Sequence, residues 1–111
     1  MSEFLYLYRG GERAQTPEQG ETQMQKWMSW MQQLATQGHM KDRGQPLEGD
    51  GKMVTGPQKS ITDGPFAEAK DLVGGYSLIE ADSLAHAAEL AKGCPIFEFG
   101  GSVEVRPVMS M

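Results

Sequence analysis

Asp63 is the side chain in this sequence whose type and setting best suit proton transfer, because it opens the segment Asp63-Gly64-Pro65-Phe66. A carboxylate at the mouth of a pocket acts as a general base when burial raises its pKa towards the working pH. Asp-Gly-Pro is also the composition of a tight turn, in which Asp caps backbone N–H groups. The sequence therefore makes Asp63 a candidate catalytic residue and leaves the turn as its simpler role.

Charged residues near both ends of the chain supply candidate substrate-binding groups. Glu104 and Arg106 occupy alternate positions of a predicted strand and so share one face of it. Val103 and Val105 favour the helix-covered side, which would put Glu104 and Arg106 on the open side. Arg9 ends the first predicted strand and could reach an anionic ligand, with a surface position as the simpler alternative.

A second charged cluster, Glu68, Lys70 and Asp71, follows the Asp-Gly-Pro turn. Such a cluster can hold a polar ligand, although it is more often solvated surface. Glu68 is retained as a candidate substrate-binding residue.

Three tyrosines complete the candidate binding set: Tyr6, Tyr8 and Tyr76. Alternation puts the aromatic residues at positions 4, 6 and 8 on one face of a strand and the two leucines between them on the other. We expect the aromatic face to be the open one, where tyrosine hydroxyls could orient a substrate oxygen. Packing against a second copy of the chain is the competing role for these tyrosines.

Few residues suit other chemistry. Two histidines and one cysteine make a structural zinc site unfavourable, and no nucleotide-binding motif is present, so we expect no metal and no cofactor. Cys94 follows the end of a predicted helix and is interpreted as packing, since reactive cysteines prefer helix N-termini or cationic neighbours. His39 is a minor acid–base candidate, and His86 is expected to face solvent.

Length and charge define the class of protein. The 111 residues fit one domain, residues 1–111, and the net charge of −5 argues against direct nucleic-acid binding. No apolar run approaches the roughly 20 residues that span a bilayer, so no membrane partner is expected. The first residues lack a signal-peptide pattern and the single cysteine cannot form an intramolecular disulfide, which favours the cytoplasm.

The elements that must position these groups can be read from periodicity and caps. Thr16 and Pro17 begin a helix over 17–37, whose apolar stripe runs through Met24, Trp27, Met28, Met31, Leu34 and Ala35. A second helix is predicted over 83–92, with Leu84, Ala87, Ala88 and Ala91 inward. Strands are predicted over 4–8, 72–81 and 102–108, the second bent or bulged at Gly74-Gly75, with a hairpin over 52–55 and 59–62. Residues 39–50 are expected to hold a short extended segment followed by turns.

This order predicts an α+β fold, a ferredoxin-like split βαβ antiparallel sheet with two helices on one face and an extra hairpin. The other sheet face would expose a contiguous aromatic patch, which usually marks an interface or a binding surface. A second copy of the chain is its simplest cover, so we expect a homodimer.

Residues 60–76, SITDGPFAEAKDLVGGY, resemble the signature of the YCII-related family, also called the DGPF domain. The segments FLYLYRG, QKWMSWMQQLATQGHMKD and GGSVEVRPV resemble the same family in the same order, so the resemblance covers nearly the whole chain. It implies a dimeric α/β barrel, in which two open sheets pack face to face. The wider superfamily includes isomerases, dehydrochlorinases and monooxygenases that act on small molecules.

The resemblance implies less about activity. Members often neighbour extracytoplasmic-function sigma factors, and in short relatives a histidine of the first helix, paired with an aspartate, is proposed as a catalytic dyad. The predicted first helix of this chain contains no histidine. Three hypotheses therefore stay open: an isomerase- or lyase-type enzyme with a pocket in the barrel, a non-catalytic ligand-binding or regulatory module linked to sigma-factor-dependent transcription, and a structural dimer.

Overall fold

The structure, a computed structural model, describes residues 1–64 and 71–111. Its main sheet has four antiparallel strands in the order β2-β5-β1-β6, which is the ferredoxin-like order predicted from the sequence. The strands are β1 (Ser2–Arg9), β2 (Met40–Asp42), β5 (Val73–Ala81) and β6 (Ser102–Pro107). The helices are α1 (Pro17–Thr36), α2 (Leu84–Ala91) and the short 3-10 helix η2 (Pro95–Phe99). The predicted hairpin is β3 (Gly51–Thr55) with β4 (Ser60–Gly64).

Local sequence explains where the elements begin and bend. The Thr16 hydroxyl accepts the Gln19 backbone N–H at 3.1 Å and so caps α1, and Ser83 caps α2 in the same way. Opposite the end of β1, the pairing shifts by one residue, because Tyr8 faces Gly75 and Arg9 faces Val73. This shift is the predicted bulge, and it leaves Gly74 as the extra residue.

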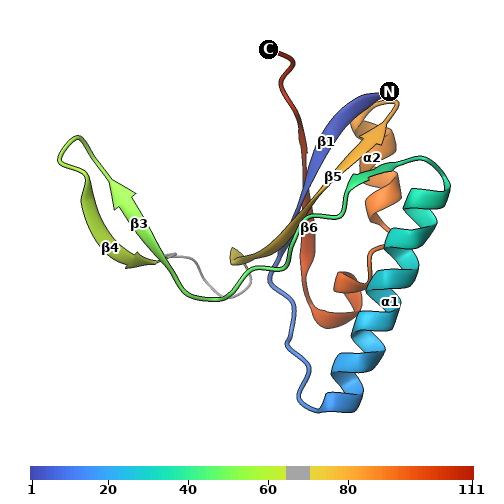
Figure 1. Ribbon diagram of the computed structural model, residues 1–111, viewed down its shortest axis with the longest axis horizontal. Helices are drawn as coiled ribbons and strands as arrows, with labels where there is room; N and C mark the ends of the chain where they lie inside the picture. Colours follow the sequence, from blue (N-terminus) through green and yellow to red (C-terminus); the bar gives the residue numbers. More distant parts are fainter. Residues whose placement is uncertain (65–70) are drawn as a thin grey trace.

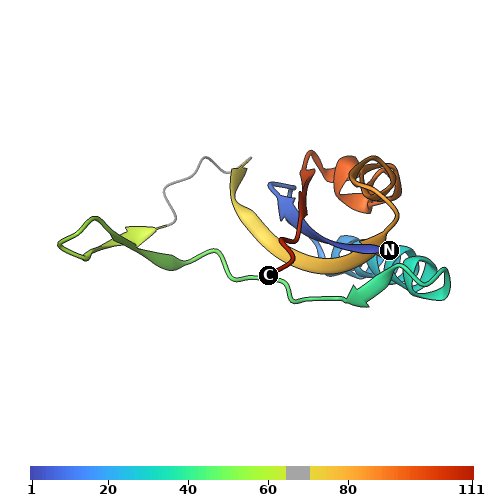
Figure 2. The same ribbon diagram turned by 90° about the horizontal axis from the view of Figure 1, so that it is seen from above.

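The layers are arranged asymmetrically around the sheet (Figures 1 and 2). Helices α1 and α2 cover one face, whereas the β3–β4 hairpin stands on the opposite side of the sheet, away from both helices. The hairpin forms a two-stranded sheet of its own. No helix within residues 1–64 and 71–111 has the length and apolarity needed to cross a membrane.

The strand register overturns the predicted choice of faces. Phe4, Tyr6 and Tyr8 are buried beneath the helices, and the half-buried Leu5 and Leu7 lie on the uncovered face. On the helix side, these aromatic side chains pack against the indole rings of α1. The Trp30 ring stacks on Tyr6 with centroids 6.1 Å apart, and the Trp27 ring meets Tyr8 edge-on at 4.8 Å.

The helix faces are also narrower than predicted. On α1, Trp30 and Leu34 are buried and Trp27 and Met31 are partly buried, but Met24 and Met28 are 60% and 55% exposed. On α2, Ala87 and Ala91 are buried, whereas Leu84 and Ala88 are exposed. A helix packed on a sheet buries only one stripe of its surface. Met24 and Met28 of α1 and Leu84 and Ala88 of α2 lie beside these stripes.

Candidate functional site

The uncovered sheet face carries a mixed apolar and charged surface. Residues paired across antiparallel strands share a face, and Leu7 is paired with Tyr76 on one side and with Glu104 on the other. In the same way, Leu5 is paired with Leu78 and Arg106. The predicted placement of Tyr76, Glu104 and Arg106 on the open side is therefore correct.

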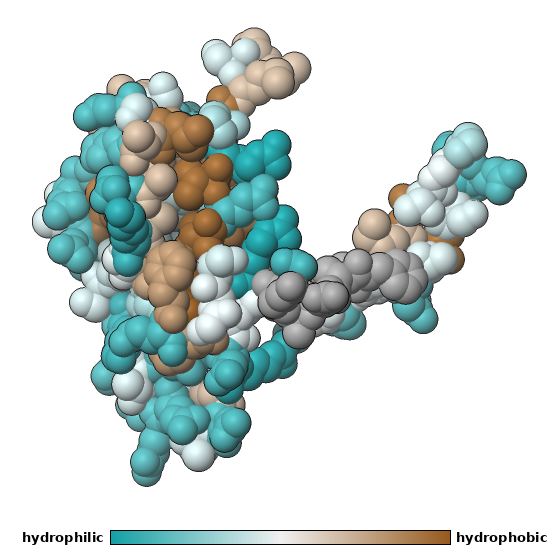
Figure 3. Space-filling model, turned by 180° about the vertical axis from the view of Figure 1, so that it is seen from behind, coloured by the Kyte–Doolittle hydropathy of each residue, from teal (hydrophilic) through white to brown (hydrophobic). Residues whose placement is uncertain are grey.

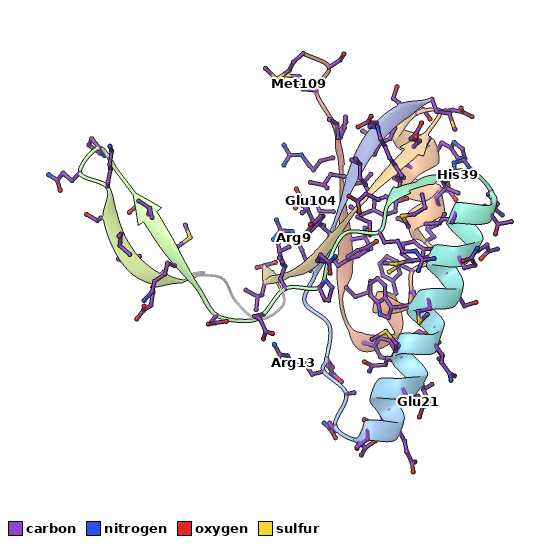
Figure 4. The ribbon with its side chains drawn as sticks, viewed as in Figure 1. Arg9, Arg13, Glu21, His39, Glu104 and Met109 are labelled. Atoms are coloured by element: carbon purple, nitrogen blue, oxygen red, sulfur yellow. The ribbon has the colours of Figure 1, made fainter. Side chains whose placement is uncertain are left out.

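An arginine–glutamate–arginine array lies on this face, and we call it the Arg9–Glu104–Arg106 array. The Arg9 Nε and Nη2 atoms each lie 2.7 Å from Glu104 Oε1, and Arg106 Nη1 lies 3.2 Å from Glu104 Oε2. Arg9 Nη1 also donates to the Asp71 carbonyl at 2.6 Å. Figure 4 shows Arg9 and Glu104 on the side of the sheet away from α1. Two cations thus hold one carboxylate between them.

The two arginines fix the protonation state of Glu104. Hydrogen bonds from Arg9 first and Arg106 second lower the pKa of its carboxyl below the ordinary value, and burial opposes them. Glu104 is therefore a carboxylate at neutral pH, better suited to holding guanidinium groups than to donating a proton. Arg106 keeps a side chain that is 65% exposed. A planar guanidinium with free donors binds carboxylates and other oxyanions in a fixed geometry.

Asp63 lies outside this array, on the hairpin. Its carboxylate accepts a hydrogen bond from Lys52 Nζ at 2.6 Å, across the β3–β4 pairing, and its side chain is 92% exposed. Within its own chain the structure does not bring Asp63 together with Glu104 or Arg106. The catalytic role of Asp63 therefore stays a prediction.

Tyr6 and Tyr8 are placed on the wrong face by the sequence prediction. The Tyr6 hydroxyl donates to the Ala87 carbonyl at 2.5 Å, and the Tyr8 hydroxyl donates to Ser77 Oγ at 2.8 Å. Burial raises the pKa of both phenols above the ordinary value. Their hydroxyls therefore hold α2 and β5 and do not reach the open face. Glu68, with its neighbour Phe66, lies outside the described residues.

The remaining reactive side chains form no separate centre. His39 Nδ1 lies 2.8 Å from the Glu80 carbonyl, and its ring meets that of His86 edge-on at 5.1 Å. Cys94 is buried, and burial raises the pKa of its thiol to about 12, as expected of a packing residue. Across residues 1–64 and 71–111, no cluster of three His, Cys, Asp or Glu side chains could hold a metal ion.

Two surface depressions lie beside α1, away from the uncovered sheet face. One, of about 710 Å³, lies between the start of α1 and Phe99, and its walls include Arg13 and Glu18. The other, of about 640 Å³, lies over Trp30 and Cys94. Neither is lined by a residue of the array or by another predicted site residue, so neither adds to the candidate site.

The pairing of Arg9 with Glu104 is the feature that sequence reasoning missed. Both residues were candidates, but their contact depends on β6 lying beside β1 in one register, with Arg9 opposite Ser102 and Glu104 two residues further on. Diagonal neighbours of this kind are within reach of long side chains. The ferredoxin-like strand order would have supplied the adjacency, though not the register.

The fold and the array define an α+β domain of ferredoxin-like topology with one charged sheet face that residues 1–64 and 71–111 leave uncovered. The family comparison agrees with this description: the chain belongs to the YCII-related domain family, whose model matches residues 3–111. A comparison with curated proteins gave no significant match.

A similar solved structure is that of 5-chloro-2-hydroxyhydroquinone dehydrochlorinase (TftG) from Burkholderia phenoliruptrix AC1100, in complex with 2,5-dihydroxybenzoquinone. It superposes with a TM-score of 0.56 and 18% sequence identity, covering 96% of this chain and 93% of that one. At this identity the likeness shows a shared fold.

Proposed function

We propose that the chain forms a homodimer whose uncovered sheet faces enclose a pocket for a small, oxygen-rich anion. In that pocket it would carry out acid–base chemistry of the isomerase or lyase type. The observation that carries the proposal is the Arg9–Glu104–Arg106 array on the sheet face opposite to the one that α1 and α2 cover. Charged groups held in a fixed geometry on an open, partly apolar face are typical of a binding surface.

The second copy is inferred from the apolar part of the face. Leu5, Leu7 and Leu78 are half-buried there, with no helix above them. Antiparallel sheets that pack face to face lie about 10 Å apart, so a second sheet would cover these leucines and leave room beside the arginines. Two-fold dimers are the commonest oligomers and use the same surface on both copies.

The charge of the face indicates the chemical class of the ligand. The exposed guanidinium of Arg106 has N–H donors beyond the one that bonds to Glu104, and Tyr76 lies on the same face. Together they suit a substrate with a carboxylate, an enolate or a phenolate oxygen. The likeness in fold to TftG, which was solved with 2,5-dihydroxybenzoquinone, makes that compound a reasonable probe. Its hydroxyl groups are conjugated to carbonyls, so it ionises readily and offers several oxyanions.

The proposed reaction moves a proton at a carbon next to a carbonyl. Asp63 takes the proton, and the electron pair of the C–H bond passes into the carbonyl to give an enolate oxygen that the arginines stabilise. The pair then returns to bind a proton at another carbon, which is an isomerisation, or expels a leaving group, which is an elimination. Glu104 keeps the two guanidinium groups side by side throughout.

The test measures mass, binding and proton transfer with one probe. We expect sedimentation to give a dimer, calorimetry to show that it binds 2,5-dihydroxybenzoquinone, and NMR in D2O to show catalysed exchange of the ring C–H hydrogens. In this probe a deuteron first adds to the ring carbon of the bound enolate to give the keto tautomer, and Asp63 then takes the proton from that carbon. Arg106→Ala should weaken binding at least about tenfold. Lys92→Ala, which removes an exposed cation from the end of α2, is the matched control and should bind normally. A monomer, or equal binding by both variants, would contradict the proposal, and binding without exchange would favour a non-catalytic ligand-binding module.

A further inference from the structure

The β3–β4 hairpin is a well-paired element that stands apart from the main sheet and the helices among the residues that the structure describes. Five residue pairs join its strands, from Gly51 opposite Gly64 to Thr55 opposite Ser60. Every residue from 51 to 63 is exposed, and the described strands of the main sheet do not pair with it. An isolated two-stranded hairpin is marginally stable in water. Contacts beyond those of the described residues would therefore stabilise it.

One face of the hairpin is built for a contact. Because Val54 is paired with Ile61 and Lys52 with Asp63, these four side chains lie on the same face. Val54 and Ile61 are 61% and 69% exposed, side by side, next to the ion pair of Lys52 and Asp63. Figure 3 shows hydrophobic residues on the hairpin, set apart from the body of the protein. The other face carries Met53, Thr55, Ser60 and Thr62, which are more polar on the whole.

The position of the hairpin indicates what covers this face. The hairpin stands on the side of the main sheet away from the helices, which is also the side on which the array lies (Figures 1 and 4). Any body that covers the open sheet face therefore comes within reach of the hairpin. A single partner can satisfy both surfaces, and under the proposed function that partner is a second copy of this chain. Two-fold symmetry would make each copy both give and receive a hairpin.

We propose that the hairpin is an arm that packs its Val54–Ile61 face against the second copy and completes the binding site there. This inference rests on the proposed homodimer. Because Asp63 shares the face of Val54 and Ile61, docking of that face turns the Asp63 carboxylate towards the other copy. Each pocket is then made of the Arg9–Glu104–Arg106 array of one chain and Asp63 of the other. This arrangement accounts for the exposure of Asp63 in a single chain.

The first experiment tests the arm. Val54→Asp should raise the dimer dissociation constant about 100-fold in sedimentation equilibrium, because it buries a charge in the contact. Thr55→Asp, one residue further on and on the opposite face, should leave the constant within about threefold of wild type. Circular dichroism checks that the body folds in both, and Val54→Ser provides a milder variant. Equal dissociation constants for Val54→Asp and Thr55→Asp would overturn the arm.

The second experiment tests whether the site is shared. Asp63→Ala should bind 2,5-dihydroxybenzoquinone but fail to exchange its ring hydrogens, and Arg106→Ala, which binds at least about tenfold more weakly, is assayed at a probe concentration that leaves its pocket largely empty. The two variants are co-expressed with different affinity tags, and the heterodimer is purified through both tags. If Asp63 acts on the other chain, one of the two pockets is wild type, so about half of the exchange activity returns. If Asp63 acts on its own chain, both pockets are defective, none returns, and the shared site is overturned.

These outcomes separate the inference from the function on which it depends. A wild-type protein that neither dimerises nor binds the probe refutes the proposed function. A wild-type dimer that binds and exchanges the probe, with no recovery in the heterodimer, refutes only the shared site. If Val54→Asp leaves the dimer unaffected but abolishes binding of an unrelated protein or peptide, the hairpin face belongs to another partner. This result too would overturn the arm.

Discussion

Arg9 and Glu104 are joined across the sheet, although 95 positions separate them in the chain: both Arg9 Nε and Arg9 Nη2 lie 2.7 Å from the same carboxylate oxygen. The contact ties the end of β1 to the middle of β6. It also orders the guanidinium that the Asp71 carbonyl holds from the other side. The array is thus fixed before any ligand arrives, which lowers the entropy cost of binding one.

The first prediction concerns Glu104→Gln and pH. The arginines lower the pKa of Glu104 in the folded protein, so its stabilisation is complete above the unfolded value of about 4.3. That stabilisation is lost as the pH falls through the lowered folded value. Urea unfolding should therefore find wild type slightly more stable than Glu104→Gln at pH 7 and equal to it at low pH. The difference should shrink in an Arg9→Gln background, and a difference that grows on acidification would contradict the assignment.

The second prediction separates the tyrosines. Tyr6→Phe removes the hydroxyl that bonds to the Ala87 carbonyl in the core, so it should lower the free energy of unfolding by about 1 kcal/mol. Tyr76→Phe, on the open face, should leave the free energy of unfolding nearly unchanged and weaken binding of the anionic probe. Urea denaturation and calorimetry on both variants measure the two effects. The reverse pattern would return Tyr6 to the binding face.

The third prediction concerns the reactivity of Cys94. Burial raises the pKa of its thiol to about 12, so almost no thiolate exists at pH 8 and the sulfur is shielded. A disulfide reagent such as DTNB should react with the native protein only as fast as the protein opens, and fully in denaturant. Ser110→Cys, near the exposed C-terminus, supplies a fast-reacting control. Rapid labelling of native Cys94 would place it at a reactive surface.

The sequence predicted the elements better than the faces. The cap at Thr16, the two glycines of β5 and the hairpin are local signals, and each was found where expected. The choice between the two faces of β1 was wrong because alternation is symmetric: it separates the aromatic residues from the leucines without saying which set meets the helices. That choice was made by the indole rings of α1, a contact between distant segments.

In the candidate site, too, the features set by local sequence were predicted and those set by contacts between distant segments were not. Glu104 and Arg106 were placed correctly because the flanking valines indicated the helix side of β6. Their link to Arg9 depends on strand order and register, which no local pattern contains. Asp63 was identified from its turn-forming motif, yet its position on a free-standing hairpin follows from the separation of the two sheets.

The fourth prediction tests the close approach of Gly44 to β5. Gly44 has φ +71°, and a Cβ there would lie 1.8 Å from the Tyr76 carbonyl oxygen. Gly44→Ala should therefore cost about 3 kcal/mol, from the left-handed conformation and the displaced backbone together. Gly38→Ala is the matched control, since Gly38 has φ +82° and nothing within 4 Å, and it should cost about 1–2 kcal/mol. Equal costs in thermal or urea unfolding would refute the contact.

The fifth prediction distinguishes charge from shape at Arg106. Its guanidinium gives one hydrogen bond to Glu104 and keeps its other donors available. Arg106→Lys retains the positive charge but loses the planar pair of donors, so the anionic probe should bind about tenfold more weakly than to wild type, while Arg106→Gln should lose more. Calorimetry at two salt concentrations separates the contribution of charge from that of hydrogen-bond geometry. Screening by salt should weaken probe binding to wild type and to Arg106→Lys, and should affect Arg106→Gln less. Equal binding by Arg106→Lys and wild type would mean that Arg106 supplies only charge, and binding unaltered in Arg106→Gln would remove Arg106 from the site.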